Sequence, residues 1–294
     1  MEINRILVIA DQNRTRDVAL DRAIALAQRS GASIHLVGFC YDPLIDDDSS
    51  PISFNRKKAQ RELLSRKQQD LDWLLDRAQA EGVTITTETV WSKQLHQWVA
   101  EQADAYDLAV KTGHRSESAF YTPTDWHLLR TSPIPLLIVS SRRWKKAKHH
   151  VLATVDLGSK RKPQRDLNQQ VLEMASAMAT LLDSELHVVY SIPISKILRE
   201  LEVVEPRIEE RRFREQHAQQ IDELCEQYGL SRKQIHLKAG DPDKVIAGAA
   251  RKIKAELVVM GTLARKGIKA ALIGNTAEAV LTHLPTDIVA MRLK

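Results

Sequence analysis

Cysteine and aromatic residues are scarce in this chain of 294 residues. The two cysteines, Cys40 and Cys225, have no CxxC spacing and no neighbouring histidine at ligand spacing. Disulfide frameworks and cysteine-based zinc sites need several cysteines at regular intervals, so we expect neither a disulfide nor a metal site, zinc included. Aromatic residues make up 5% of a chain that is 43% hydrophobic, so aliphatic side chains dominate its apolar content.

Long apolar runs and a secretion signal are also absent from the sequence. No run approaches the roughly 18 apolar residues that cross a bilayer. The N-terminus lacks the charged, apolar and small-residue regions of a signal peptide. We therefore expect a cytoplasmic protein without a membrane span, with a length that suits two domains of ordinary size.

The net charge of +5 is unevenly distributed. Residues 1–144 hold 18 Lys and Arg against 19 Asp and Glu, whereas residues 145–294 hold 25 against 19. The basic excess gathers in 145–150, in 160–162 and after Gly261. We interpret it as a solvated surface, with a phosphate or nucleic-acid contact as the alternative. Because no nucleic-acid-binding motif accompanies the charge, we do not expect nucleic acid as a partner.

One stretch of sequence occurs twice. The segment Arg5–Asp11 (RILVIAD) returns 145 positions later as His150–Asp156 (HVLATVD), and three further segments return in the same order at offsets of 149 to 152. A period near 150 residues is the size of a domain rather than of a solenoid repeat. We therefore predict a tandem duplication, with an N-terminal domain at 1–144 and a C-terminal domain at 149–294.

Short apolar runs alternate with amphipathic stretches in each half. The runs are continuous, which is typical of parallel strands that are buried on both faces. This alternation predicts an α/β fold in which each domain is an open, doubly wound, parallel five-stranded sheet, with ligands beyond the carboxyl ends of the strands. Long charged surface helices, or lids over the sheet edge, are predicted at 56–81 and 196–228. The strands predicted in the first half are Ile6–Ile9, Ile34–Phe39, Val83–Val90, Leu108–Lys111 and Leu136–Val139.

The segment after the fourth strand of the second half has the pattern of an anion site. The strand leads into Gly261, a basic loop with Arg265 and Gly267 follows, and Gly274–Thr276 opens a predicted helix. Glycine lets a phosphate approach the backbone, because a side chain would hold it away. The N-terminus of the predicted helix would attract negative charge. The alternative is an ordinary strand-to-helix turn with a cap residue.

Both halves resemble the universal stress protein (Usp) family, whose domains have an adenine-nucleotide alpha-hydrolase-like fold. A nucleotide-binding Usp domain carries Gly-x2-Gly-x9-Gly-(Ser/Thr) after its fourth strand. Here Gly261, Ala264 and Gly274 keep the spacing, with alanine in place of the second glycine, and Asn275 follows. The resemblance implies a role in the stress response.

The resemblance also implies a role for two residues outside that loop. Asp156 follows the first strand of the second half and would face the adenine side of the pocket. Val188 lies on the next strand and would pack against the base. The candidate cofactor is ATP or a related nucleotide, and the sequence leaves its identity open.

The first half departs from this motif. Thr122–Thr124 stands opposite Gly274–Thr276, and its proline removes a backbone donor. Together with Gly274–Glu278, the strings Lys111–Glu117 and Tyr121–Arg130 resemble the tandem-domain UspE-like subfamily. Three polar residues after the fourth strand form a candidate second site for an anionic group: Lys111, His114 and Arg115.

We expect a non-enzymatic stress protein whose C-terminal domain binds a nucleotide or nucleotide-bearing ligand and which protects against stress such as DNA damage or starvation. No catalytic motif is present, and we expect His35 and His187, at equivalent strand positions, to satisfy buried hydrogen bonds. The expected ligand-binding residues are Asp156, Val188, Gly261, Arg265, Gly267, Gly274, Asn275 and Thr276.

Three alternatives stand beside this expectation. The protein could be a scaffold that acts through protein contacts, a binder of an amphipathic ligand in an apolar cavity, or a weak ATPase. The resemblance further implies that the two halves pair within the chain through their fifth strands. A homodimer formed through the helices is an additional expectation.

Overall fold

The computed structural model describes residues 2–11, 17–47, 54–78, 82–113, 123–140, 144, 149–262, 280, 284 and 286–293. They form two compact units, the first with the described residues up to Ser140 and the second with those from Trp144 onward. Each unit is an open parallel sheet with helices on both faces, so the predicted fold class is confirmed. Within the described residues, no helix combines the length and the apolar character needed to cross a membrane.

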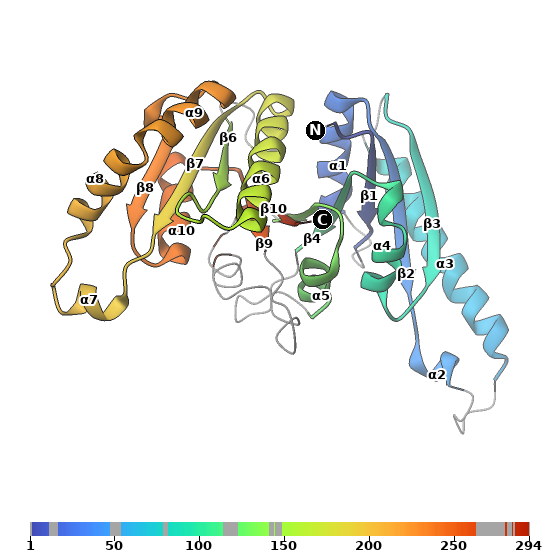
Figure 1. Cartoon of the computed structure of the whole chain (residues 1–294). Coiled ribbons are helices and arrows are strands. Elements are labelled where there is room, and N and C mark those ends of the chain that lie inside the picture. The colour runs from blue at the N-terminus through green and yellow to red at the C-terminus, as the bar shows by residue number, and fades with distance from the viewer. Residues whose placement is uncertain are drawn as a thin grey trace. The chain divides into compact units, whose positions relative to one another are not determined.

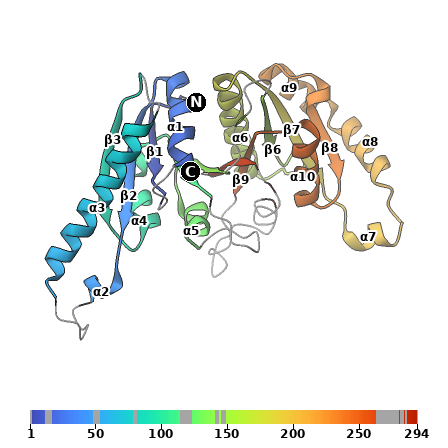
Figure 2. The ribbon, with the colours of Figure 1, turned by 180° about the vertical axis from the view of Figure 1, so that it is seen from behind.

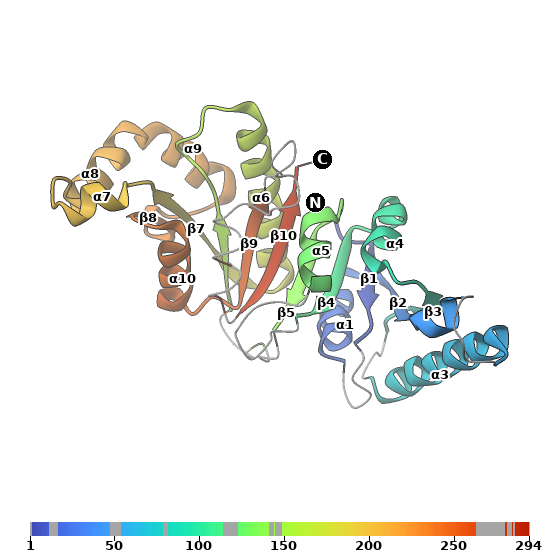
Figure 3. The ribbon, with the colours of Figure 1, turned by 90° about the horizontal axis from the view of Figure 1, so that it is seen from below.

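The strands of the first unit lie in the order β3-β2-β1-β4-β5 and all pair in parallel (Figure 1). The order reverses between β1 and β4, which makes this the switch point of a doubly wound sheet. Right-handed crossovers put α1 and α3 on one face and α4 and α5 on the other (Figure 3). The elements are β1 Arg5–Ile9, α1 Val18–Ser30, β2 Ser33–Cys40, α2 Pro43–Asp46, α3 Arg56–Arg77, β3 Ile85–Trp91, α4 Leu95–Glu101, β4 Leu108–Thr112, α5 Pro123–Thr131 and β5 Leu136–Val139.

The second unit repeats this order as β8-β7-β6-β9-β10, with its switch point between β6 and β9. Figures 2 and 3 show α6 and α9 on one side of these strands and α10 on the other. The elements are β6 His149–Thr154, α6 Lys162–Leu181, β7 Ser184–Ile192, α7 Lys196–Glu200, α8 Pro206–Gln216, α9 Ala218–Tyr228, β8 Ile235–Ala239, α10 Pro242–Ile253, β9 Leu257–Thr262 and β10 Asp287–Arg292.

The charged stretch 196–228 differs from the long helix that the sequence predicts. It forms three helices instead of one, α7, α8 and α9. Glu202 adopts a left-handed φ of 54°, and Pro206 opens α8, because proline fits the first turn of a helix but not its interior. His217, with φ −113° and ψ 21°, separates α8 from α9. The equivalent stretch of the first unit is one continuous helix, α3.

Local signals explain where α1 begins and ends. The carboxylate of Asp17 accepts a hydrogen bond of 3.0 Å from the backbone N–H of Leu20, which caps the first turn. Gly31 ends the helix with a φ of 76°, and its N–H donates to the carbonyl of Ala27 at 2.8 Å. These caps set the position of the helix along β1 and β2.

Candidate functional site

The carboxyl ends of β6 and β9 meet where the strand order of the second unit reverses. Thr154 pairs with Met260 in the register, so Asp156, which follows β6, and Gly261, near the end of β9, lie at the same edge of the sheet. The structure therefore brings these two predicted site residues together at the kind of edge where open α/β sheets bind ligands. The side chain of Asp156 is half-buried there.

The side chain of Asn168 holds the backbone of Asp156 at both polar groups. The N–H of Asp156 donates to Oδ1 of Asn168 at 3.0 Å, and Nδ2 of Asn168 donates to the carbonyl of Asp156 at 2.8 Å. An amide side chain can do both because it carries an acceptor and a donor side by side. The turn after β6 is therefore hydrogen-bonded to α6, and the two hydrogen bonds with Asn168 set the position of the Asp156 backbone.

Tyr190 also lies at this edge, and it is not among the site residues predicted from the sequence. Its hydroxyl hydrogen-bonds with the carboxylate of Asp156 and with the backbone of Gly158. Burial, followed by the charge of Asp156, raises the pKa of Tyr190 to about 12, so the hydroxyl keeps its proton and donates to the carboxylate. The Tyr190 ring packs on Phe213 of α8, with 4.9 Å between ring centroids. No local motif marks Tyr190, since only the register of β7 against β6 brings it to Asp156.

Gly261 has a packing role in the structure. A Cβ atom at this position would lie 2.7 Å from Cγ and from Cδ2 of Leu167, whose side chain is 2% exposed. The absence of a side chain therefore lets α6 pack closely on β9. This reason for glycine is independent of the approach of a phosphate that the sequence predicts.

Val188 lies inside the sheet. It pairs with Ala153 on one side and with Ile235 on the other, and its side chain has no exposed surface. Alternation along β7 gives it the same face as Tyr190, two residues further on. The remaining predicted ligand-binding residues lie outside the described residues: Arg265, Gly267, Gly274, Asn275 and Thr276.

In the first unit, the candidate second site contains a buried ion pair that the sequence did not predict. Nζ of Lys111 lies 2.6 Å from Oδ1 of Asp125, with the two side chains 10% and 0% exposed. The same ammonium group donates to the carbonyl of Thr112 at 3.0 Å. The charge of Lys111 is thus directed to a carboxylate of α5. His114 and Arg115, the other two residues of this candidate site, lie outside the described residues.

The first unit also differs next to Asp11, the counterpart of Asp156. Gly38 occupies the position equivalent to Tyr190, and the stem of Lys67 covers it, since a Cβ on Gly38 would lie 2.8 Å from Cε of Lys67. Nζ of Lys67 then donates to the carbonyl of Asp11 at 3.2 Å. A lysine from α3 therefore lies where the second unit has a tyrosine from β7.

The strand histidines make the hydrogen bonds that the sequence predicts, although both bonds are only partly buried. Nδ1 of His35 lies 2.5 Å from the hydroxyl of Tyr106, and Nδ1 of His187 lies 3.1 Å from Nε2 of His236. Burial is the main cause that lowers the pKa of both residues, and the neighbouring imidazoles help to bring His187 to about 4. His187 is therefore neutral at neutral pH.

Comparison with known proteins relates this chain to one family. It matches the Universal stress protein family over residues 2–140 and 149–292. It is 30% identical to universal stress protein E of Salmonella typhi and of Escherichia coli K12, over 98% of this chain and 93% of each relative. A universal stress protein E homolog of Haemophilus influenzae is 28% identical, over 99% of this chain and 98% of the relative.

Solved structures share the fold across both units. A functionally unknown protein from Pseudomonas aeruginosa PAO1 has a TM-score of 0.71 and 29% identity, over 99% of this chain and 93% of that chain. A universal stress protein from Archaeoglobus fulgidus has a TM-score of 0.72 and 16% identity, over 100% of both chains. With two matched regions and relatives that align over nearly its whole length, the chain belongs to the universal stress protein family, as a tandem member of the UspE-like type.

Proposed function

We propose that the second unit binds a nucleotide or a nucleotide-bearing molecule at the edge that contains Asp156 and Gly261. The protein would act in stress resistance through this binding, in the cytoplasm and without catalysing a reaction. One observation carries the proposal: Asn168 fixes the backbone of Asp156 at the switch point, and Tyr190 orients its carboxylate. A preoriented carboxylate at such a point is an acceptor for the hydroxyl or amino groups of a nucleoside.

The phosphate end of the ligand would lie along the segment that follows β9. Arg265 would supply positive charge, and the backbone from Gly267 to Thr276 would supply N–H donors, as the resemblance to the Usp motif implies. Asp156 would then contact the nucleoside end. In this arrangement the Asp156 carboxylate would accept hydrogen bonds from the nucleoside, and the basic segment would bind the phosphate groups.

The test begins with native mass spectrometry of the full chain as purified, followed by titration with ATP. Asp156→Asn removes the charge and keeps the size of the side chain, and Asp11→Asn is the matched control in the first unit. Loss of a hydrogen bond to a charged group predicts an affinity about 10- to 100-fold lower for Asp156→Asn, with the control unchanged. The proposal fails if Asp156→Asn and Gly274→Val both bind ATP as tightly as the unmodified chain.

The scaffold alternative is favoured by one surface. Five apolar side chains on α7, on the segment that follows it and on the first turn of α8 are exposed: Ile197, Leu198, Leu201, Val203 and Ile208, at 66%, 42%, 65%, 64% and 55%. Clustered exposed apolar residues are typical of protein contacts. An apo mass that gains no ATP on titration would favour this alternative, and Leu201→Lys should then reduce self-association measured by light scattering.

A further inference from the structure

The amino ends of β6, β7 and β8 carry imidazole and carboxylate groups on one face of the sheet. His150 pairs with Glu185 in the register, His187 is two residues beyond Glu185 on β7, and His236 pairs with Val189. Because side chains alternate along strands, residues two apart share a face. This set of groups lies at the opposite edge of the sheet from Asp156.

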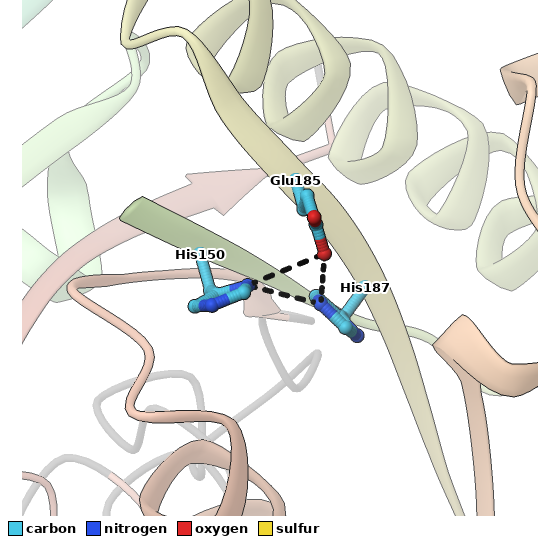
Figure 4. Close-up of side chains that lie close together, drawn as sticks. All are labelled: His150, Glu185 and His187. Atoms are coloured by element: carbon cyan, nitrogen blue, oxygen red, sulfur yellow. Dashed lines mark hydrogen bonds and ion pairs between the residues drawn. The ribbon is translucent and has the colours of Figure 1, made fainter. Parts of the chain in front are cut away.

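Three of these side chains converge on one point, as Figure 4 shows. Nδ1 of His150 lies 3.2 Å from Nε2 of His187, and Oε2 of Glu185 lies 3.8 Å from the first nitrogen and 3.7 Å from the second. A point equidistant from three atoms at these separations is about 2.1 Å from each, and zinc bonds to imidazole nitrogen and carboxylate oxygen are about 2.0–2.2 Å long. The separations therefore fit a single metal ion without movement of the backbone.

The chemistry and the exposure of the three groups suit a divalent transition metal. Two histidines and one glutamate, with water in an open position, form a ligand set that zinc uses in proteins. The side chains of Glu185, His150 and His187 are 63%, 23% and 10% exposed, so an ion can enter from the Glu185 side. The potential ligand atoms of His150, Glu185 and His187 all lie within 4.8 Å of one another. Among the His, Cys, Asp and Glu residues of the described ranges, these three form the group that meets this distance.

His236 contacts the ring nitrogen of His187 that does not face Glu185 and His150. Its Nε2 lies 3.1 Å from Nδ1 of His187, and the two rings stack with 5.3 Å between centroids. If Nδ1 of His187 carries the proton and donates it to His236, Nε2 of His187 presents its lone pair to the ion. A partner on the second ring nitrogen is typical of metal-ligating histidines, because it fixes the tautomer and the ring orientation.

The first unit provides an internal comparison. Arg5, Ser33, His35 and Glu88 occupy the positions equivalent to His150, Glu185, His187 and His236. There His35 contacts Glu88 at 3.4 Å and the Tyr106 hydroxyl, while the Arg5 guanidinium lies over the Tyr106 ring. A guanidinium cannot bind a metal ion and repels one. The fold thus forms without these ligands, so the ligand set is specific to the second unit.

We propose that Nδ1 of His150, Nε2 of His187 and Oε2 of Glu185 bind one divalent transition-metal ion of the zinc type, with water completing the coordination. The scarcity of cysteine predicts no metal site, but this set of ligands contains no cysteine. The site lies at the other edge of the sheet from the proposed nucleotide site, so it does not depend on nucleotide binding.

The test is calorimetric titration of the chelator-treated full chain with Zn²⁺, repeated with Co²⁺ to record the visible absorption of bound cobalt. We expect one tightly bound ion per chain. Glu185→Gln and His150→Ala, both at solvent-accessible positions, should each weaken binding by about 100-fold or more, because loss of an outer-shell partner alone costs roughly 10- to 100-fold. His236→Asn should weaken it by roughly 10-fold or more, because it removes the partner that orients His187.

Two controls separate this site from other histidines. His35→Asn changes the equivalent position of the first unit, and His96→Asn changes a histidine that stacks on His127 at 4.8 Å between ring centroids. Both controls should bind Zn²⁺ like the unmodified chain. Absence of tight binding in the unmodified chain overturns the proposal, and so does unchanged affinity in Glu185→Gln and His150→Ala. In either case the imidazoles serve only as a hydrogen-bonded chain across β6, β7 and β8.

Discussion

Nζ of Lys111 lies 2.6 Å from Oδ1 of Asp125, and both side chains are withdrawn from solvent. The pair links β4 to α5 at the edge where the sequence predicts a second anion site. A buried charge is tolerated only when it is paired, because desolvation of a lone charge is expensive. The lysine is therefore part of the packing between this strand and this helix.

Separating this pair should destabilise the first unit strongly. Asp125→Asn leaves the Lys111 ammonium without its carboxylate, and we expect a loss of about 3–5 kcal/mol in the free energy of unfolding. The double variant Lys111→Met, Asp125→Leu replaces both charges with apolar groups and should fall within about 1 kcal/mol of the unmodified chain or exceed it. Urea denaturation measures both. A double variant as unstable as the single one would show that the ion pair itself is required.

Gly261→Ala should destabilise the second unit through Leu167. The added methyl group would lie 2.7 Å from the leucine, so the side chain or α6 must move, at about 1–3 kcal/mol. Leu167→Ala makes room, so the double variant should be more stable than the sum of the two single effects. Thermal unfolding of all three variants checks this. Strict additivity would show that the two residues do not conflict.

Tyr190 should make stability fall at alkaline pH. Its pKa is raised to about 12 in the folded state, against an ordinary value near 10. Below pH 10 the Tyr190 hydroxyl is protonated in both the folded and the unfolded chain, so its contribution to the free energy of unfolding is fully present. Between pH 10 and 12 only the unfolded state releases this proton, so stability is lost as the pH rises. Tyr190→Phe should show a shallower loss in this range.

Absorbance of tyrosinate measures the same effect directly. The difference between the titrations of the unmodified chain and of Tyr190→Phe isolates one hydroxyl, which should ionise near pH 12. Ionisation of that hydroxyl near pH 10 would mean that Tyr190 is neither buried nor in contact with Asp156 in solution.

Asn168 should matter for both stability and ligand binding. Asn168→Ala removes the two hydrogen bonds to Asp156 and should cost about 1–3 kcal/mol. Asn168→Asp keeps the acceptor for the Asp156 N–H but puts an acceptor against the Asp156 carbonyl, so we expect an effect at least as large. Chemical denaturation and ATP titration are the measurements. Normal stability and normal affinity in Asn168→Asp would exclude the role assigned to this contact.

Much of the fold follows from local patterns in the chain. The predicted strand Leu136–Val139 has the observed bounds, because the loops on either side of this short apolar run limit where the strand can begin and end. β3 begins at Ile85 rather than Val83, since the boundaries of a strand are weakly encoded by the residues at its ends. The predicted helix at 196–228 was wrong in its continuity, although Pro206 in the sequence could have marked the break.

The candidate site was predictable only in part. Asp156 and Gly261 could be assigned to one edge because each follows or ends an apolar strand, and parallel strands end at the same edge. Tyr190 could not be assigned, because its contact with Asp156 depends on how β7 is registered against β6. The loop that carries Gly274 remains a prediction from motif resemblance.

Local patterns in the chain were enough to predict the two α/β units, because periodicity, apolar runs and cap residues act over a few neighbouring positions. Which residues meet became clear from the folded chain: Asp125 with Lys111, Leu167 with Gly261, and Glu185 with the histidines of β6 and β7. Those contacts depend on strand register and on the rotation of helices over the sheet. Both are set by packing between segments that lie far apart in the chain, so no local pattern encodes them.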